Sequence, residues 1–180
     1  HQLGTPISAL VAWVEYLRLQ PENETVCNEL TKDINRLDMI TKRFSQIGTS
    51  PELIQANIIP IIQDAMNYLS SRSSKKITYN INLPANEEIK LPINQCLLEW
   101  VLENLSKNAI DAMSGIGTLS LELTQDNKRV IIDISDTRKG MPKKQFKKIF
   151  EAGYTTKERG WGMGLSLAKR IIEEYHHGKI

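Results

Sequence analysis

Two stripes of apolar residues near the start of the chain constrain its fold more than any other feature. Apolar side chains recur every three or four residues, first in Leu3, Ile7, Leu10, Val14 and Leu17, then in Leu30, Ile34, Leu37, Ile40, Phe44 and Ile47. This spacing places each stripe along one face of a helix. Residues 20–23, Gln-Pro-Glu-Asn, interrupt the pattern, so residues 1–47 are predicted to form a hairpin of two helices.

A lone helical hairpin cannot enclose a core. Two copies related by a two-fold axis would bury all four stripes, which predicts a homodimer held by a four-helix bundle. The competing arrangement folds the hairpin back onto the rest of its own chain and leaves a monomer. Light scattering distinguishes the two arrangements.

The remainder of the chain mixes helical and strand patterns without strict alternation. Residues 48–53 have the composition of a linker, and residues 54–180 are predicted to form a second domain. We expect helices at 58–69, 93–113, 142–150 and 164–175 and strands at 77–83, 117–124 and 129–135, the last two forming a hairpin. The whole is an α+β chain whose second domain is an α/β sandwich, with helices on one face of a mixed sheet.

Three glycines alternate with other residues directly before the last helical run. They are Gly160, Gly162 and Gly164, followed at once by Leu165. Glycine tolerates positive φ and has no Cβ, so its backbone N–H groups can turn toward a phosphate chain. The start of the following helix adds its positive end, which favours a phosphate ligand.

Asn104, Asn108 and Asp111 are spaced by four and three residues within the helical run 93–113. They therefore share one face of that helix. Amide oxygens are hard, uncharged ligands, and they suit a Mg²⁺ ion that a triphosphate has already largely neutralised. A solvated polar helix face is the alternative for these residues taken without context.

A buried-strand pattern at 130–134 runs into Asp136 and then into a polar turn that contains Gly140. A carboxylate at the end of a buried strand can accept a hydrogen bond from an exocyclic amine such as that of adenine. Thr156 and Lys157 follow, shortly before the glycines. The order of these segments predicts a site for a magnesium-bound nucleotide.

These segments resemble, in order and separation, the N, G1, F and G2 boxes of sensor histidine kinases. The nucleotide domain of that family belongs to the gyrase, Hsp90, histidine kinase and MutL superfamily. The stretches Asn-Ala-Ile-Asp-Ala-Met, Thr-Thr-Lys and Gly-x-Gly-x-Gly-Leu-Ser-Leu look especially like the nitrogen-regulation type. The resemblance implies a Bergerat-type ATP-binding domain over residues 54–180 without its final strands. It implies ATP and Mg²⁺ as cofactors, the metal at Asn104 and Asn108, and nucleotide contacts from Asn104, Asn108, Asp111, Asp136, Gly140, Thr156, Lys157, Gly160, Gly162, Gly164 and Leu165.

Residues 1–6, His-Gln-Leu-Gly-Thr-Pro, resemble the H box of the same family. The resemblance implies that His1 takes the phosphoryl group from ATP and passes it to an aspartate of a response regulator. Gln2 stands where most H boxes carry an acidic residue. Thr5 stands where the family often positions water for dephosphorylating its partner, although a hydroxyl bonded to the helix backbone is an equal alternative.

Two functions follow from these residues. The first is an active two-component sensor histidine kinase. The second is an ATP-binding dimeric scaffold or phosphatase with weak kinase activity, because Gln2 cannot neutralise the imidazole. Asn104 argues against hydrolysis of ATP, since the hydrolysing members place a glutamate there. Arg138 and the pair Ala152-Gly153 also depart from the family pattern and leave the conformation of the lid open.

Charge and cysteine content add the remaining expectations. The net charge of +2 gives no reason to invoke nucleic acid, and the lysines of residues 139–148 suit a basic lid over ATP. Cys27 and Cys96 have no paired spacing, so we expect reduced thiols in a cytosolic environment. No apolar run approaches the length of a membrane span, so no membrane contact is expected here. We interpret the chain as the cytosolic piece of a membrane-anchored sensor, with its first domain truncated at the N-terminus.

Overall fold

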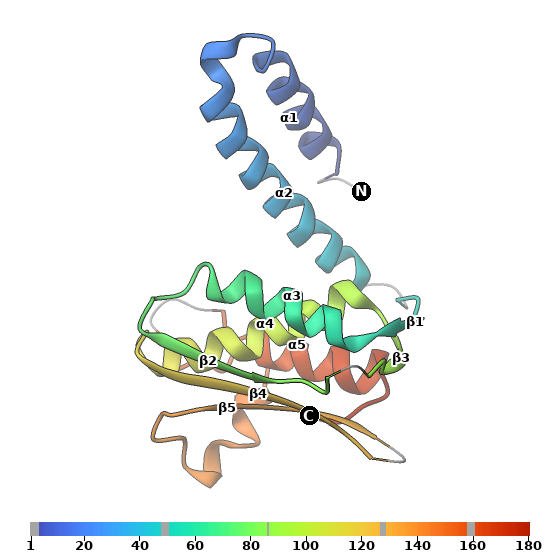
Figure 1. Ribbon diagram of the computed structural model, residues 1–180, viewed down its shortest axis with the longest axis vertical. Coiled ribbons are helices and arrows are strands. Elements are labelled where there is room, and N and C mark those ends of the chain that lie inside the picture. Colours follow the sequence, from blue (N-terminus) through green and yellow to red (C-terminus); the bar gives the residue numbers. More distant parts are fainter. Residues whose placement is uncertain (1–3, 48–50, 86, 127–128, 158–160) are drawn as a thin grey trace. The chain divides into compact units, whose positions relative to one another are not determined.

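The structure consists of two units with different kinds of core. It is a computed structural model that describes residues 4–47, 51–85, 87–126, 129–157 and 161–180. The chain divides into residues 1–51 and residues 52–180, shown in Figure 1. None of the described helices combines the length and the apolar character that crossing a bilayer requires.

The first unit is the predicted hairpin. Helix α1 spans Gly4–Leu17 and helix α2 spans Glu24–Ile47, with a 3₁₀ turn at Pro21–Asn23 between them. Proline at the start of this turn supplies a fixed φ, and it lacks the N–H that would continue the helix. The side chain of Asn23 donates to the carbonyl oxygen of Leu17 at 3.2 Å, which closes the turn.

Few side chains form the core of this hairpin. Val14, Cys27 and Ile34 are buried, and Ile7 packs against them. The thiol of Cys27 donates to the carbonyl oxygen of Val14 at 3.7 Å. Both cysteines are free thiols, as predicted. Most other described apolar side chains of the hairpin are exposed: Leu10, Val11, Trp13, Tyr16, Leu17, Leu19, Val26, Leu30 and Leu37.

The second unit contains two sheets. Strands β2 (Ile77–Asn82), β4 (Gly117–Gln125) and β5 (Val130–Asp136) form a mixed sheet in the order β2-β4-β5. Strand β2 pairs with β4 in parallel, and β5 pairs with β4 antiparallel. Strands β1 (Ile54–Asn57) and β3 (Lys90–Ile93) form a separate antiparallel ribbon.

Three helices form a layer over one face of the larger sheet (Figure 1). They are α3 (Ile58–Ser70), α4 (Gln95–Ala112) and α5 (Gly164–Arg170). A π-helical turn at Ile171–Tyr175 continues α5. Asn57 and Asn94 cap α3 and α4, since their side-chain oxygens accept from backbone N–H groups of the first turns. Helices on one face of a mixed sheet agree with the predicted α+β class.

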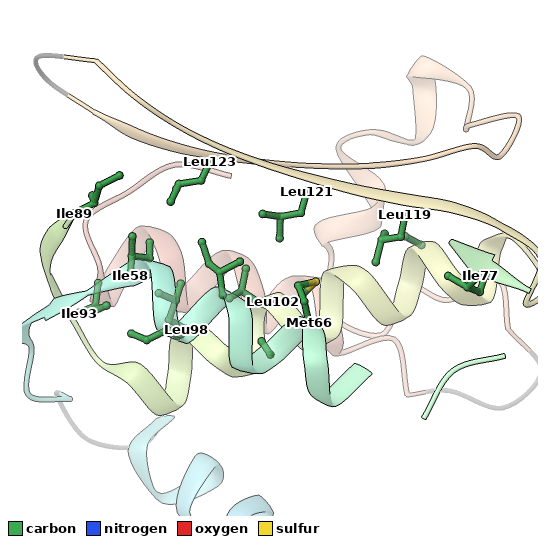
Figure 2. Close-up of a cluster of buried hydrophobic side chains, with 14 of the residues drawn as sticks. Ile58, Met66, Ile77, Ile89, Ile93, Leu98, Leu102, Leu119, Leu121 and Leu123 are labelled. Carbon is green, nitrogen blue, oxygen red and sulfur yellow. The ribbon is translucent and has the colours of Figure 1, made fainter. Parts of the chain in front are cut away.

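The core of this unit lies between the sheet and the helices (Figure 2). Leu119, Leu121 and Leu123 of β4 point toward Met66 of α3 and Leu102 of α4. The alternate residues of β4 face the other side, which leaves a polar outer surface on the sheet. This unit therefore closes its core within one chain.

Several predicted elements differ from the structure. The strands β1 and β3 were not predicted, and Ile93 ends β3 instead of starting a helix. The helix predicted at 142–150 is wrong: this segment forms two 3₁₀ turns, Lys143–Gln145 and Lys148–Phe150. The other predicted strands and helices of the second unit are found within about two residues of their predicted ends, except that the last α-helix ends at Arg170 and reaches Tyr175 only as a π-helical turn.

Candidate nucleotide-binding site

Helix α4 supplies the first side of the site. One of its faces is buried in the core through residues such as Leu98 and Leu102. Asn104 and Asn108 are half-buried and Asp111 is exposed. The cap at Asn94 fixes where the helix begins, and the burial of its apolar face fixes which face carries these three side chains.

Lys157 joins this face from a segment more than forty residues away. Its ammonium group donates to Oδ1 of Asn108 at 2.9 Å and to Oδ2 of Asp111 at 2.8 Å. Its backbone N–H donates to the hydroxyl of Thr155 at 3.1 Å, which fixes a tight turn before the contact. Three of the predicted residues thus meet at one point, where a cation lies between an amide oxygen and a carboxylate.

Gly164 lies against Asn104. A Cβ added to Gly164 would come within 3.1 Å of Oδ1 of Asn104, which is tighter than most Cβ contacts. The start of α5 therefore approaches α4 closely because residue 164 has no side chain. Leu165 follows in α5 and is half-buried.

Gly162 serves a contact between two loops. Its φ is +64°, and a Cβ there would overlap the carbonyl carbon of Gly153 and lie 2.6 Å from the carbonyl oxygen of that residue. The N–H of Gly153 donates to the carbonyl oxygen of Gly162 at 3.0 Å. The sequence predicts a phosphate contact for Gly162. In the structure, glycine is required at this position because the backbone of Gly153 leaves no room for a Cβ. Gly153, noted only as a departure from the family pattern, has a φ of +84° and forms the other half of the contact.

Asp136 ends strand β5. One of its carboxylate oxygens accepts from the backbone N–H of Arg138 at 2.8 Å. The hydroxyl of Thr137 accepts from the N–H of Thr118 at 3.1 Å, and the guanidinium of Arg138 donates to Ser114 at 3.1 Å. These bonds hold the end of β5 against the end of α4 and the start of β4.

Sequence reasoning missed the supporting residues Ser114, Thr137 and Gly117. A Cβ at Gly117 would lie 2.5 Å from the sulfur of Met113 and 2.7 Å from the hydroxyl of Thr137. A glycine that opens a strand directly after a helix is a signal for such close packing, and it was available in the sequence. Arg138 departs from the family pattern, and its guanidinium donates to the hydroxyl of Ser114.

The other predicted residues are not brought into these contacts. Gly140 has a φ of +77°, and a Cβ added there would meet nothing within 4 Å. Thr156 is exposed beside Lys157. Thr5 is exposed on α1, in the first unit. His1, Gln2 and Gly160 lie outside the described residues.

A hollow of about 250 Å³ opens on the outer face of the larger sheet, away from the predicted residues. Glu122 and Asp133 line it and lie opposite each other in the register of β4 and β5. Two facing carboxylates repel a phosphate chain, so this hollow does not suit a nucleotide. The geometry around α4 remains the candidate site.

Comparison with known proteins agrees with this geometry. Residues 94–180 match the family described as "Histidine kinase-, DNA gyrase B-, and HSP90-like ATPase". This range includes α4, the end of β5, Lys157 and the glycine segment.

The chain is also similar along its whole length to sporulation kinase E of Bacillus subtilis. The two are 29% identical over 189 residues, which cover 100% of this chain and 25% of that protein. The chain spans 25%, 35% and 40% of the first three curated relatives it matches. Longer proteins therefore contain a region like the whole of this chain.

Solved structures of histidine kinases share this fold. The nucleotide-free catalytic domain of histidine kinase ThkA has a TM-score of 0.66 and 27% identity, and the match covers 72% of this chain and 86% of that one. Histidine kinase ThkA in complex with the response regulator protein TrrA gives a TM-score of 0.64 at 23% identity, covering 100% of this chain and 54% of that one. Residues 94–180 thus match the family of ATPases that includes histidine kinases, DNA gyrase B and HSP90, and the chain shares its fold with a histidine kinase catalytic domain.

Proposed function

We propose that the chain is the core of a two-component sensor histidine kinase, which transfers a phosphoryl group from ATP to its own histidine. The observation that carries this proposal is the meeting of Asn108, Asp111 and Lys157 beside Asn104 and Gly164, within a domain of the ATPase family. The same core in other proteins is joined to further regions, and the kinase activity of the intact protein is part of the proposal.

The residues of α4 fit a divalent metal. The ammonium of Lys157 lies within hydrogen-bond distance of Asn108, which means that this amide oxygen already faces a cation. Asn104 and Asn108 would hold Mg²⁺, and the ion supplies partial neutralisation of the phosphate charge. Amide ligands add no charge of their own, which suits a metal that arrives with a triphosphate.

The remaining contacts would orient the nucleotide. Asp136 has one oxygen held by Arg138, and its carboxylate can accept the exocyclic amine of adenine. Lys157 and the amides near Gly162 and Gly164 would steady the phosphate oxygens. Asn104 is a poor base at neutral pH, so water near the γ-phosphate would not be activated as in the hydrolysing members of the superfamily.

His1 is the proposed acceptor. Neutral imidazole has a reference pKa of about 6.5, so most of it is unprotonated near neutral pH. A ring nitrogen forms a bond to the γ-phosphorus while the bond from that phosphorus to the bridging oxygen breaks, and ADP leaves. Gln2 would accept the hydrogen bond of the other ring N–H. The phosphoryl group would then pass to an aspartate of a response-regulator partner.

The hairpin would bring two copies together. Leu10, Leu17, Leu30 and Leu37 belong to the predicted stripes and are exposed in one chain. Burying them against a second copy would form the four-helix bundle of a homodimer. The side chains of Ile40, Phe44 and Ile47 lie outside the described part. We extend the proposal to the nitrogen-regulation type of kinase and to the cytosolic part of a membrane-anchored sensor, on the motifs alone.

Labelling with γ-labelled ATP and Mg²⁺ tests the proposal. We expect an acid-labile label on the protein that His1→Ala removes and that His177→Asn, at an exposed position, retains. Binding of Mg-ADP, measured by calorimetry, should survive both substitutions. Absence of an acid-labile label on a protein that binds Mg-ADP would overturn the kinase assignment. Absence of nucleotide binding would overturn the whole site.

The second candidate is a nucleotide-binding scaffold or phosphatase, and Gln2 is the residue that favours it. A glutamine accepts a hydrogen bond from imidazole but cannot neutralise its developing positive charge. If the general-base magnitude applies in full, Gln2→Glu should raise the rate of labelling by up to about 10²-fold. A weakly labelled wild type that this substitution activates would favour the second candidate.

A further inference from the structure

The contact between Lys157 and α4 places a cation beside a proposed metal ligand. A lysine expected to meet phosphate lies instead 2.9 Å from Asn108, which is expected to face the metal, and 2.8 Å from Asp111. The ammonium therefore takes the place next to Asn108 that a metal ligated by this amide would occupy.

Lysine and free metal exclude each other at this point. Mg²⁺ binds oxygen at about 2.0–2.1 Å, so an ion on the amide oxygen of Asn108 would lie within about 5 Å of the ammonium. Two cations at that separation repel each other. Lys157 also neutralises Asp111, the carboxylate of this cluster, and leaves only uncharged amides for the ion. Free Mg²⁺ gives up its water reluctantly and gains little from such ligands.

A phosphate chain removes this obstacle. The ion pair is half-exposed, with 43% and 41% of the two side chains accessible, and exposed pairs are weak. An arriving triphosphate offers the ammonium a new anionic partner and carries the metal with it. Lys157 can then leave Asp111 for the phosphate, while Asn108 becomes available to the ion.

We propose that Lys157 is a specificity-determining residue that closes the metal site to free divalent cations and opens it to metal bound to a nucleotide. The inference rests on the proposed function, because it assumes that Asn104 and Asn108 face the metal of a nucleotide complex. It adds that Lys157 releases Asn108 and Asp111 only when metal and phosphate arrive together.

Binding of Mn²⁺ alone, measured by electron paramagnetic resonance of the free ion, tests this inference without reference to activity. We expect Lys157→Met to bind Mn²⁺ at least about fivefold more tightly than the wild type, since it removes both the competing cation and the neutralisation of Asp111. Lys90→Met is the matched control, because Lys90 also forms an ion pair, with Glu88 at 3.1 Å. This control should bind Mn²⁺ like the wild type.

A double variant locates the bound ion. In Lys157→Met with Asp111→Asn, most of the gain in Mn²⁺ affinity should be lost, because the unmasked carboxylate is gone and only the removal of the competing cation remains. Circular dichroism and thermal unfolding establish that each variant is folded. Equal Mn²⁺ binding by the wild type and folded Lys157→Met, or a gain that Asp111→Asn leaves undiminished, would overturn the inference.

Calorimetry with Mg-ADP separates this failure from failure of the proposed function. If the wild type binds Mg-ADP and Lys157→Met leaves Mn²⁺ binding unchanged, only the role of Lys157 is wrong. If the wild type does not bind Mg-ADP, the nucleotide site itself is wrong. We expect binding of Mg-ADP by the wild type and weaker binding by Lys157→Met, since the lysine is also needed at the phosphate.

Discussion

The two units differ in how much of their apolar surface they bury within one chain. The second unit encloses a large cluster between a sheet and three helices, as Figure 2 shows. The described hairpin buries Val14, Cys27 and Ile34, and it leaves large side chains such as Trp13 and Tyr16 mostly exposed. Because exposed apolar stripes of this size mark interaction sites, the hairpin is expected to need a partner, whereas the second unit does not.

The largest expected effect tests the need of the hairpin for a partner. Leu10→Glu should abolish the dimer, since Leu10 lies on the stripe of α1 and is 43% exposed in one chain. A two-fold interface loses the side chain twice, at about 1.5–3 kcal/mol for each leucine, or about 3–6 kcal/mol for the pair. Analytical ultracentrifugation measures the shift from dimer to monomer. Leu19→Glu, at an exposed position beyond α1, should remain dimeric.

A wild-type chain that sediments as a monomer at tens of micromolar would break this comparison. The stripe would then be covered within one chain, which is the competing arrangement stated at the outset. Nucleotide binding by the second unit should not change in Leu10→Glu.

The next largest effect tests the self-sufficient core. Leu121 is fully buried in β4, and Leu121→Ala should lower the free energy of unfolding of the second unit by about 2–5 kcal/mol. Urea unfolding at two protein concentrations measures it, and the loss should not depend on concentration. Ile131→Ala changes an exposed residue of the neighbouring strand and should cost much less. Equal losses of unfolding free energy in the two variants would mean that the face of the sheet that carries Leu121 is not the buried one.

Long periodic elements of both units could be predicted from the sequence, and short ones could not. Helix α4 carries its apolar repeat over many turns, so its existence and its polar face were correctly predicted. Strands β1 and β3 have four residues each, and Pro92 within β3 argues against a strand. Their pairing joins Ile54 to Ile93 across the whole of α3, which no local pattern reveals.

Some features of the candidate site could likewise be predicted from the sequence, and others could not. The residue types predicted on α4 are present on one face, because helical spacing determines that face. The contact of Lys157 with Asp111 depends on how a distant loop folds, and nothing near either residue in the sequence predicts it. The close approach of Gly153 to Gly162 was missed for a different reason. Gly153 was judged only as a departure from the family pattern, and its conformational freedom as a glycine was not considered.

A smaller effect distinguishes a change in nucleotide binding from a change in the stability of the sheet core. Gly162→Ala places a Cβ against the backbone of Gly153 at a φ of +64°, so it should strain the loop contact by about 1–3 kcal/mol. Calorimetry should show Mg-ADP binding about tenfold weaker, with little change in urea unfolding of the sheet core. Gly115→Ala has a similar φ of +77° but only an ordinary contact of 3.6 Å, and it should bind Mg-ADP like the wild type. Equally weakened Mg-ADP binding in both variants would mean that the flexibility of glycine matters, and not the close approach of Gly162 to Gly153.

The smallest effect concerns the link between His176, after the last helical turn, and Asn94, at the start of α4. Nε2 of His176 accepts from the backbone N–H of Asn94 at 3.1 Å, and Nδ1 lies 2.9 Å from the carbonyl oxygen of Ile171. Since the first bond requires an unprotonated Nε2, Nδ1 carries the proton and donates to Ile171. His176→Ala removes both bonds and should cost about 1 kcal/mol in urea unfolding. His177→Asn changes an exposed neighbour whose φ is +54°, a conformation that asparagine tolerates, so it should cost almost nothing. Equal effects would mean that the link between the last helix and the start of α4 contributes nothing to the stability of this unit.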